Sequence, residues 1–232
     1  MSSSKPQILL LMEETPDELL EDIYPEFLTA LRTKFQTKDI SYKSAKSLSL
    51  SQSQPAVILA VSGTITERRY RPLHDELVSF VKNDGGTLIC CCQFSSFCRP
   101  PDLTTFMAKF NLPWKSGDYH RSTFVLNGAF KDRFGADRFG RLLPAYSMKA
   151  LHVDKASSAA VIYGPDSASR TQSMVFPPSS VDQAQAPVVL ERCGKGEVGY
   201  VGDVNPEDGT QELLLVMVEN ALRASMDEGV GS

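Results

Sequence analysis

Three adjacent cysteines, Cys90, Cys91 and Cys92, are the first residues in this sequence whose type and position could do chemistry. They end the apolar run 87–92, which follows two glycines that stop a helix and is typical of a strand buried on both faces of a parallel sheet. Such a strand delivers Cys92 to its C-terminal edge, where an activated thiol is a nucleophile. Core packing is the common fate of a free cysteine, so it explains Cys90 and Cys91 and is the alternative for Cys92.

Polar residues follow three other apolar runs and would reach the same edge of a parallel sheet. Open α/β sheets hold their binding sites at this edge, although carboxylates at a helix entry also interact favourably with the helix dipole. The residues are Glu13 and Glu14 after the run 7–12, Ser62, Gly63 and Thr64 after the run 56–61, and the segment Gly202–Glu207 after the run 197–201.

The three histidines differ in their access to this edge. His120 follows a loop and can approach the edge, so it is the best candidate for a general base. His74 stands in the first turn of a helix and is expected at the surface, and His152 alternates with apolar residues in a strand and is expected to be structural. The cysteine spacing does not match the Cys-x2-4-Cys pairs of zinc sites, so we expect no metal. The segment 194–196 (Gly-Lys-Gly) lacks the frame of a phosphate-binding loop, so we expect no cofactor.

The elements that would position these residues alternate between strands and helices. Strands are predicted at 7–12, 56–61 and 87–92, with a helix after each, and Pro25 is expected to kink or split the first helix. This alternation predicts a parallel sheet with right-handed crossovers. Runs 187–192 and 197–201 flank a glycine turn and predict an antiparallel hairpin, which precedes a final helix capped by Thr210. We expect residues 1–232 to form one α/β domain with a mostly parallel sheet of five or six strands flanked by helices.

The segment 164–187 predicts a long polar loop with an apolar centre at Met174, Val175 and Phe176. Such a patch is either tucked against the core or held out for a partner. The simpler expectation is that it is tucked, because isolated surface Phe and Met side chains usually find a local groove.

Composition excludes several classes of protein. The formal net charge is −4, and the densest basic patch, residues 68–71, holds only three arginines, so we expect no nucleic-acid partner. No apolar run is long enough for a signal peptide or a membrane span. Five cysteines without a disulfide framework predict a reducing compartment, the cytosol or nucleus, and argue against secretion.

The order of elements resembles the class I glutamine amidotransferase-like superfamily, whose members have a flavodoxin-like, three-layer fold. The best local matches are the unit Leu77–Cys92 (helix, Gly-Gly, strand, Cys) and the segment Val188–Leu222 (hairpin, Gly-Asp, helix). The second segment is similar to the end of ThuA-like proteins especially. The resemblance covers roughly residues 6–222 and implies a site at the C-terminal edge of the sheet.

Carried over residue by residue, the resemblance puts Cys92 at the position of the family's nucleophile. Asn205 stands in place of the histidine base, followed in register by Pro206 and Glu207. Ser62, Gly63 and Thr64 match the loop whose backbone N–H groups form an oxyanion hole. In Pfp-type relatives an acidic residue near this edge contacts the nucleophile, and Glu13 and Glu14 are the acidic residues at this edge here.

The sequence departs from the family at the base and at both glycines of the nucleophile turn. Cys90 and Phe94 replace those glycines, which argues against a tight turn, and an asparagine amide cannot accept a thiol proton as an imidazole does. The departures predict a catalytically silent domain that serves as a binding or scaffolding module for a protein or a small polar ligand. The alternative is a cysteine-dependent hydrolase or amidase that uses Cys92 with a non-standard base such as His120.

Overall fold

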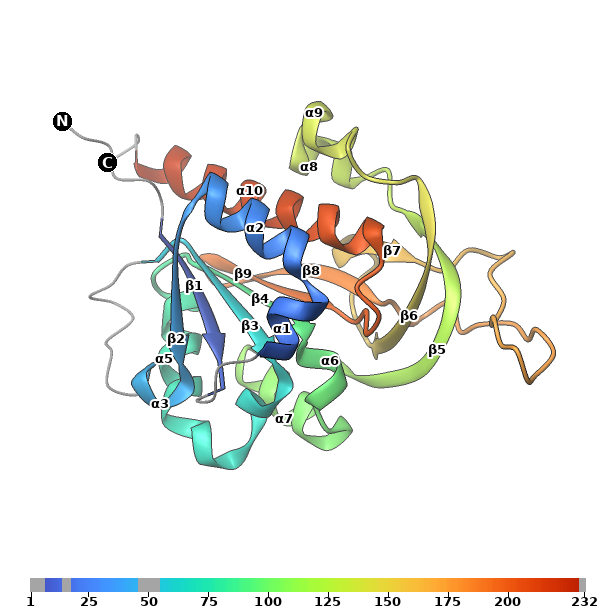
Figure 1. The fold of residues 1–232 in the computed structure, drawn as a ribbon, viewed down its shortest axis with the longest axis horizontal. Coiled ribbons are helices and arrows are strands. Elements are labelled where there is room, and N and C mark those ends of the chain that lie inside the picture. The colour runs from blue at the N-terminus through green and yellow to red at the C-terminus, as the bar shows by residue number, and fades with distance from the viewer. Residues whose placement is uncertain (1–6, 14–17, 46–54, 230–232) are drawn as a thin grey trace.

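The computed structural model describes residues 7–13, 18–45 and 55–229, and its strands form one sheet (Figure 1). The strand order is β2-β1-β3-β4-β9-β8-β7-β5-β6. The strands are β1 (Gln7–Met12), β2 (Gln36–Ser41), β3 (Val57–Ser62), β4 (Thr87–Gln93), β5 (Lys115–Leu126), β6 (Ala145–Asp154), β7 (Val161–Gly164), β8 (Val188–Cys193) and β9 (Gly196–Val201). The helices are α1 (Glu18–Ile23), α2 (Pro25–Lys34), α3 (Tyr42–Ala45), α5 (Arg71–Lys82), α6 (Phe94–Phe97), α7 (Pro100–Lys109), α8 (Phe130–Phe134), α9 (Ala136–Phe139) and α10 (Asp208–Gly229), with short 3-10 turns η1 (Gly63–Thr66), η2 (Arg68–Tyr70) and η3 (Ser158–Ala160).

The five strands from β2 to β9 are parallel, and the remaining strands pair antiparallel. The strands β3 and β4 are buried along their whole length, as their continuous apolar runs predict. Pro25 begins α2 and so separates it from α1, because a proline has no N–H for a helix interior but suits a first turn. The tight turn between β8 and β9 uses Gly194 at φ 63°.

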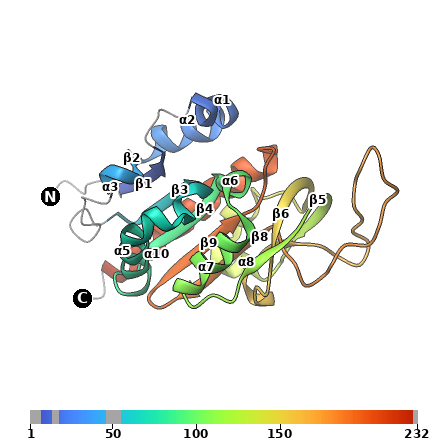
Figure 2. The same cartoon turned by 90° about the horizontal axis from the view of Figure 1, so that it is seen from below.

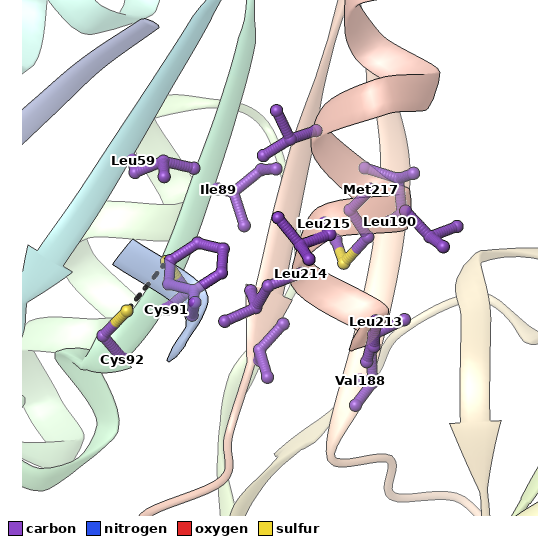
Figure 3. Close-up of a cluster of buried hydrophobic side chains, with 14 of the residues drawn as sticks. Leu59, Ile89, Cys91, Cys92, Val188, Leu190, Leu213, Leu214, Leu215 and Met217 are labelled. Carbon is purple, nitrogen blue, oxygen red and sulfur yellow. Dashed lines mark hydrogen bonds between the residues drawn. The ribbon is translucent and has the colours of Figure 1, made fainter. Parts of the chain in front are cut away.

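Helices cover both faces of the sheet and bury two apolar clusters (Figures 1 and 2). One cluster joins one sheet face to α1, α2, α8 and α10, where Leu214 and Met217 pack near Ile89 and Leu190 (Figure 3). The other joins the opposite face to α3, α5 and α7. The predicted three-layer α/β fold, with a large mostly parallel sheet and antiparallel strands toward the C-terminus, is thereby confirmed.

The sheet is longer than the five or six strands that we expected. The two longest strands, β5 and β6, form a curved antiparallel pair (Figure 1). Most of their residues are partly or fully exposed, and a register shift interrupts β5 between Ser116 and Tyr119, so neither strand gives a continuous apolar run. No helix within the described ranges is both long and apolar enough to cross a membrane.

Candidate functional site at the C-terminal edge of the sheet

Cys92 lies where β4 turns directly into α6. Its backbone has φ 58°, a left-handed conformation that costs a non-glycine residue about 1–3 kcal/mol. The side chain is only 2% exposed, and Cys92 Sγ lies 3.7 Å from Cys91 Sγ (Figure 3). A tight turn therefore forms at the position of the expected nucleophile, inside the protein.

The expectation that Phe94 would prevent such a turn is wrong. Phe94 is fully buried, and its ring packs near Phe106 and Tyr200 in the cluster on the α5 and α7 side. Cys91 and Cys92 belong to the opposite cluster. Because the bulky ring points away from the thiols, it does not crowd the turn, and glycine is not needed there.

The loop after β3 lies against this turn. A Cβ atom on Gly63 would lie 2.2 Å from the carbonyl oxygen of Phe94 and 2.3 Å from the backbone nitrogen of Cys98, so only glycine fits. The register of β3 with β4 also aligns Ser62 with Gln93. The structure thus brings Ser62 and Gly63 beside the β4–α6 turn that carries Cys92.

The hydroxyl groups of this loop are held by Glu13. Ser62 Oγ and Thr64 Oγ1 donate to the same oxygen, Glu13 Oε1, at 3.0 and 2.9 Å. The phenol of Tyr42 donates to the carbonyl of Ser62 at 2.7 Å. A carboxylate beside this loop opposes a second negative charge, so the surroundings favour a hydrogen-bonding or cationic ligand over an oxyanion. Glu14, the residue we predicted for this site, lies outside the described residues.

The segment after β9 is built around a buried carboxylate, Asp203. Its Oδ1 accepts from the backbone N–H of Asn205 at 2.9 Å. Its Oδ2 accepts from the N–H of Glu207 at 2.9 Å and from the hydroxyl of Thr210 at 2.5 Å. Asp203 is 1% exposed, and this burial raises its pKa. Thr210, predicted to cap the last helix, lies instead inside α10 and donates to Asp203.

Asn205 and Glu207 both turn toward Arg121 of β5. Arg121 forms an ion pair of 2.6 Å with Glu207. In the amide orientation that satisfies its neighbours, Asn205 Oδ1 accepts from the same guanidinium group at 2.9 Å. The position that the resemblance assigns to a base therefore holds the amide of Asn205. The carboxylate of Glu207 forms an ion pair with Arg121.

The curved strand β6 closes this edge of the sheet. Leu151 N–H donates to the carbonyl of Gly202 at 3.0 Å, and Val204 N–H donates to the carbonyl of Lys149 at 3.0 Å. A Cβ atom on Gly202 would lie 2.0 Å from Leu151 O. The antiparallel half of the sheet thus folds back onto the segment that holds Asn205.

Tyr24, at the α1–α2 junction, lies near both Cys92 and Asp203. It is 1% exposed, and burial raises its pKa, with smaller contributions from Cys92 and Asp203. Tyr24 and Arg121 were not predicted from the sequence, and Asp203 was placed at this edge only as part of the segment Gly202–Glu207. The only available signal was the Gly-Asp pair at the end of the hairpin.

Two of the three histidines, His120 and His152, lie against each other. His120 and His152 stack on each other with ring centroids 4.3 Å apart. His152 Nδ1 bonds the carbonyl of Asp118 at 2.7 Å, while Nε2 of both rings is buried without a hydrogen-bond partner. Burial lowers the pKa of His120 and lowers that of His152 to about 4. His120 as a base for Cys92 stays a prediction, with its Nε2 bonded to no thiol.

His74 corrects another expectation. It is 2% exposed rather than a surface residue, and its Nε2 lies 2.6 Å from the carbonyl of Ile65. Within the described ranges, no three His, Cys, Asp or Glu side chains converge in a way that could hold a metal ion.

Comparison with solved structures shows a fold shared with ThuA-like proteins. A protein of Parabacteroides merdae described as ThuA-like aligns with 94% of this chain and 90% of its own, with a TM-score of 0.56 and 10% identity. The cytoplasmic protein STM1381 of Salmonella typhimurium aligns over 94% of this chain and 96% of its own, with a TM-score of 0.52 and 11% identity.

The same fold occurs as part of larger proteins. The β-galactosidase of Bacillus circulans matches 96% of this chain, with a TM-score of 0.56 and 13% identity, but this chain spans only 31% of that enzyme's length. At such identities the likeness establishes the fold alone. No protein-family model matches the chain, and no curated protein matches its sequence.

Proposed function

We propose that this chain is a catalytically silent domain of the class I glutamine amidotransferase-like type that acts as a binding or scaffolding module. The observation that carries the proposal is Asn205, which the resemblance puts at the position of the histidine base and which forms hydrogen bonds with Asp203 and Arg121. A thiol needs a titratable group to take up its proton and return it to the leaving group, a contribution of about 10²–10⁴-fold in rate.

Two further features support a silent site. Cys92 is 2% exposed, so a substrate carbonyl has little access to its sulfur. The hydroxyls of Ser62 and Thr64 already bond Glu13, whose charge would oppose an oxyanion intermediate. A protein-binding role gains support from the loop tip at Phe176, which is 72% exposed.

The alternative, a cysteine-dependent hydrolase or amidase, is favoured by one observation. Cys92 has the left-handed backbone of a nucleophile turn, at φ 58°, and such strained residues cluster at active sites. Because this backbone strain lowers the stability of the fold, we test directly whether the Cys92 thiol is reactive.

The test compares glutamine hydrolysis and thiol alkylation in the purified full chain. We expect no glutamine turnover above that of the Cys92→Ala variant. We also expect Cys92 to react with iodoacetamide at pH 7 no faster than Cys98, an internal control whose pKa is raised by burial to about 12. Turnover that disappears in Cys92→Ala, together with selective alkylation of Cys92, would overturn the proposal and establish the alternative.

A further inference from the structure

The loop between β7 and β8 carries three exposed apolar side chains at its tip. Met174, Val175 and Phe176 are 105%, 80% and 72% exposed. The expectation that this patch would be tucked against the core is therefore wrong, and Figures 1 and 2 show the loop projecting from the body of the protein. A contiguous apolar tip on a projecting loop is typical of an interaction site.

Hydrogen bonds within the loop restrict the conformation of the tip. Ser173 Oγ accepts from the backbone N–H groups of Val175 and Phe176, both at 3.1 Å. At its base, Thr171 N–H donates to Ser179 O and Ser179 N–H donates to Thr171 Oγ1, both at 2.9 Å. Two prolines at 177–178 further restrict the chain. Because the tip is already ordered, little conformational entropy is lost when it binds.

A hollow of about 430 Å³ lies at the base of the same loop. Its apolar lining comes from Val125 of β5, Ala168 and Pro178, with Thr123 beside them. Val125 is itself 36% exposed. The other residues that line the hollow are polar or charged, so the hollow offers a small apolar area within a mostly polar lining.

We propose that the tip of one copy of this chain docks into the hollow of a second copy, and the reverse, about a two-fold axis. In a two-fold dimer the two contacts are equivalent, so each tip meets the hollow of the other copy.

Charge at the hollow is also self-complementary. Among the described residues Arg170 forms no ion pair, and its guanidinium donates only to the carbonyls of Ser167 and Ser169. Asp166 lines the same hollow and has only neutral donors. Across a two-fold axis, Arg170 of one copy and Asp166 of the other can meet at the rim of the interface.

This inference rests on the proposed binding role of the loop but not on the state of Cys92. The experiment is sedimentation velocity of the purified full chain from about 1 to 100 μM, a range that spans a micromolar Kd. We expect a monomer–dimer equilibrium. Phe176→Ser should weaken it by about tenfold or more, while Phe97→Ser, which replaces another exposed phenylalanine (48% exposed) on α6, should leave it unchanged.

A second variant tests the reciprocal contact. Val125→Glu places a charge in the hollow and should also give monomers, with unchanged circular dichroism. An equimolar mixture of Phe176→Ser and Val125→Glu should recover part of the dimer, because one pairing joins an intact tip to an intact hollow.

Three results would overturn the inference: a wild-type chain that is monomeric at 100 μM, dimers that persist in Phe176→Ser, or unfolding of Phe176→Ser. A monomeric wild type that binds a different protein through Phe176 would overturn the second-copy inference and leave the proposed function standing. Glutamine turnover dependent on Cys92 would do the opposite.

Discussion

His152 should make this protein sensitive to acid at a pH that leaves most proteins folded. It is 1% exposed, and burial lowers its pKa from 6.5 to about 4, with the neighbouring His120 adding to the effect. Between pH 6.5 and 4 the His152 ring therefore stays neutral in the folded state, whereas it is protonated in the unfolded chain. Since a tenfold change in proton affinity corresponds to about 1.4 kcal/mol, this difference lowers the free energy of unfolding by about 3 kcal/mol at pH 4.

The sign follows from which state binds more protons. Above pH 6.5 His152 is neutral in both states, so its protonation does not lower the free energy of unfolding. Between pH 6.5 and 4 only the unfolded state is protonated, so stability falls as the pH falls. The groups that face the ring are His120, also of lowered pKa, and Asp118, which tends to raise the pKa of His152.

The variant His152→Asn isolates this contribution. An asparagine side-chain N–H can take the place of Nδ1 and keep the bond to Asp118 O, but it does not titrate. Urea unfolding of both proteins at pH 7 and pH 4 should show that the wild type loses about 3 kcal/mol more than the variant. Leu28→Ala, which truncates a fully buried side chain of α2, should lower stability equally at both pH values. Parallel pH dependence in wild type and His152→Asn, or a ring-proton NMR titration of His152 near 6.5, would refute the reasoning.

Two further variants test the framework of the site by urea unfolding. Asp203→Ala removes the acceptor of three hydrogen bonds and should lower the free energy of unfolding by about 2–4 kcal/mol; a loss under about 0.5 kcal/mol would show that Asp203 does not hold the segment. Gly63→Ala forces a Cβ atom onto Phe94 O and should cost about 2 kcal/mol or more, whereas Gly128→Ala, with open space around the new methyl group, is the neutral control. Equal effects of the two glycine variants would contradict the close packing of the β3 loop.

The sequence alone determined the strands that are buried along their whole length and the breaks and turns that a proline or glycine requires. The continuous apolar runs of β1, β3 and β4 required burial on both faces, and Pro25 required a break between two helices. Gly194 required a turn between β8 and β9. In each case the cause is local: an apolar run without alternation, a missing N–H, or a positive φ. These elements also fixed the edge of the sheet at which Cys92 and Ser62 lie.

Only the tertiary structure decided which side chains meet. Arg121 pairs with Glu207 across 86 residues of chain, and Glu13 bonds Ser62 across 49, so neither contact leaves a trace in local spacing. His74 looked exposed from its place in a helix, but α5 turns that face toward Ile65 and Phe106. The exposure of Phe176 depended on the same kind of fact, since Ser173 satisfies the turn internally and no groove receives the ring. Which side chains are buried, and which residues they contact, depends on the packing of segments that are distant in the sequence. These contacts form only when the sheet has assembled.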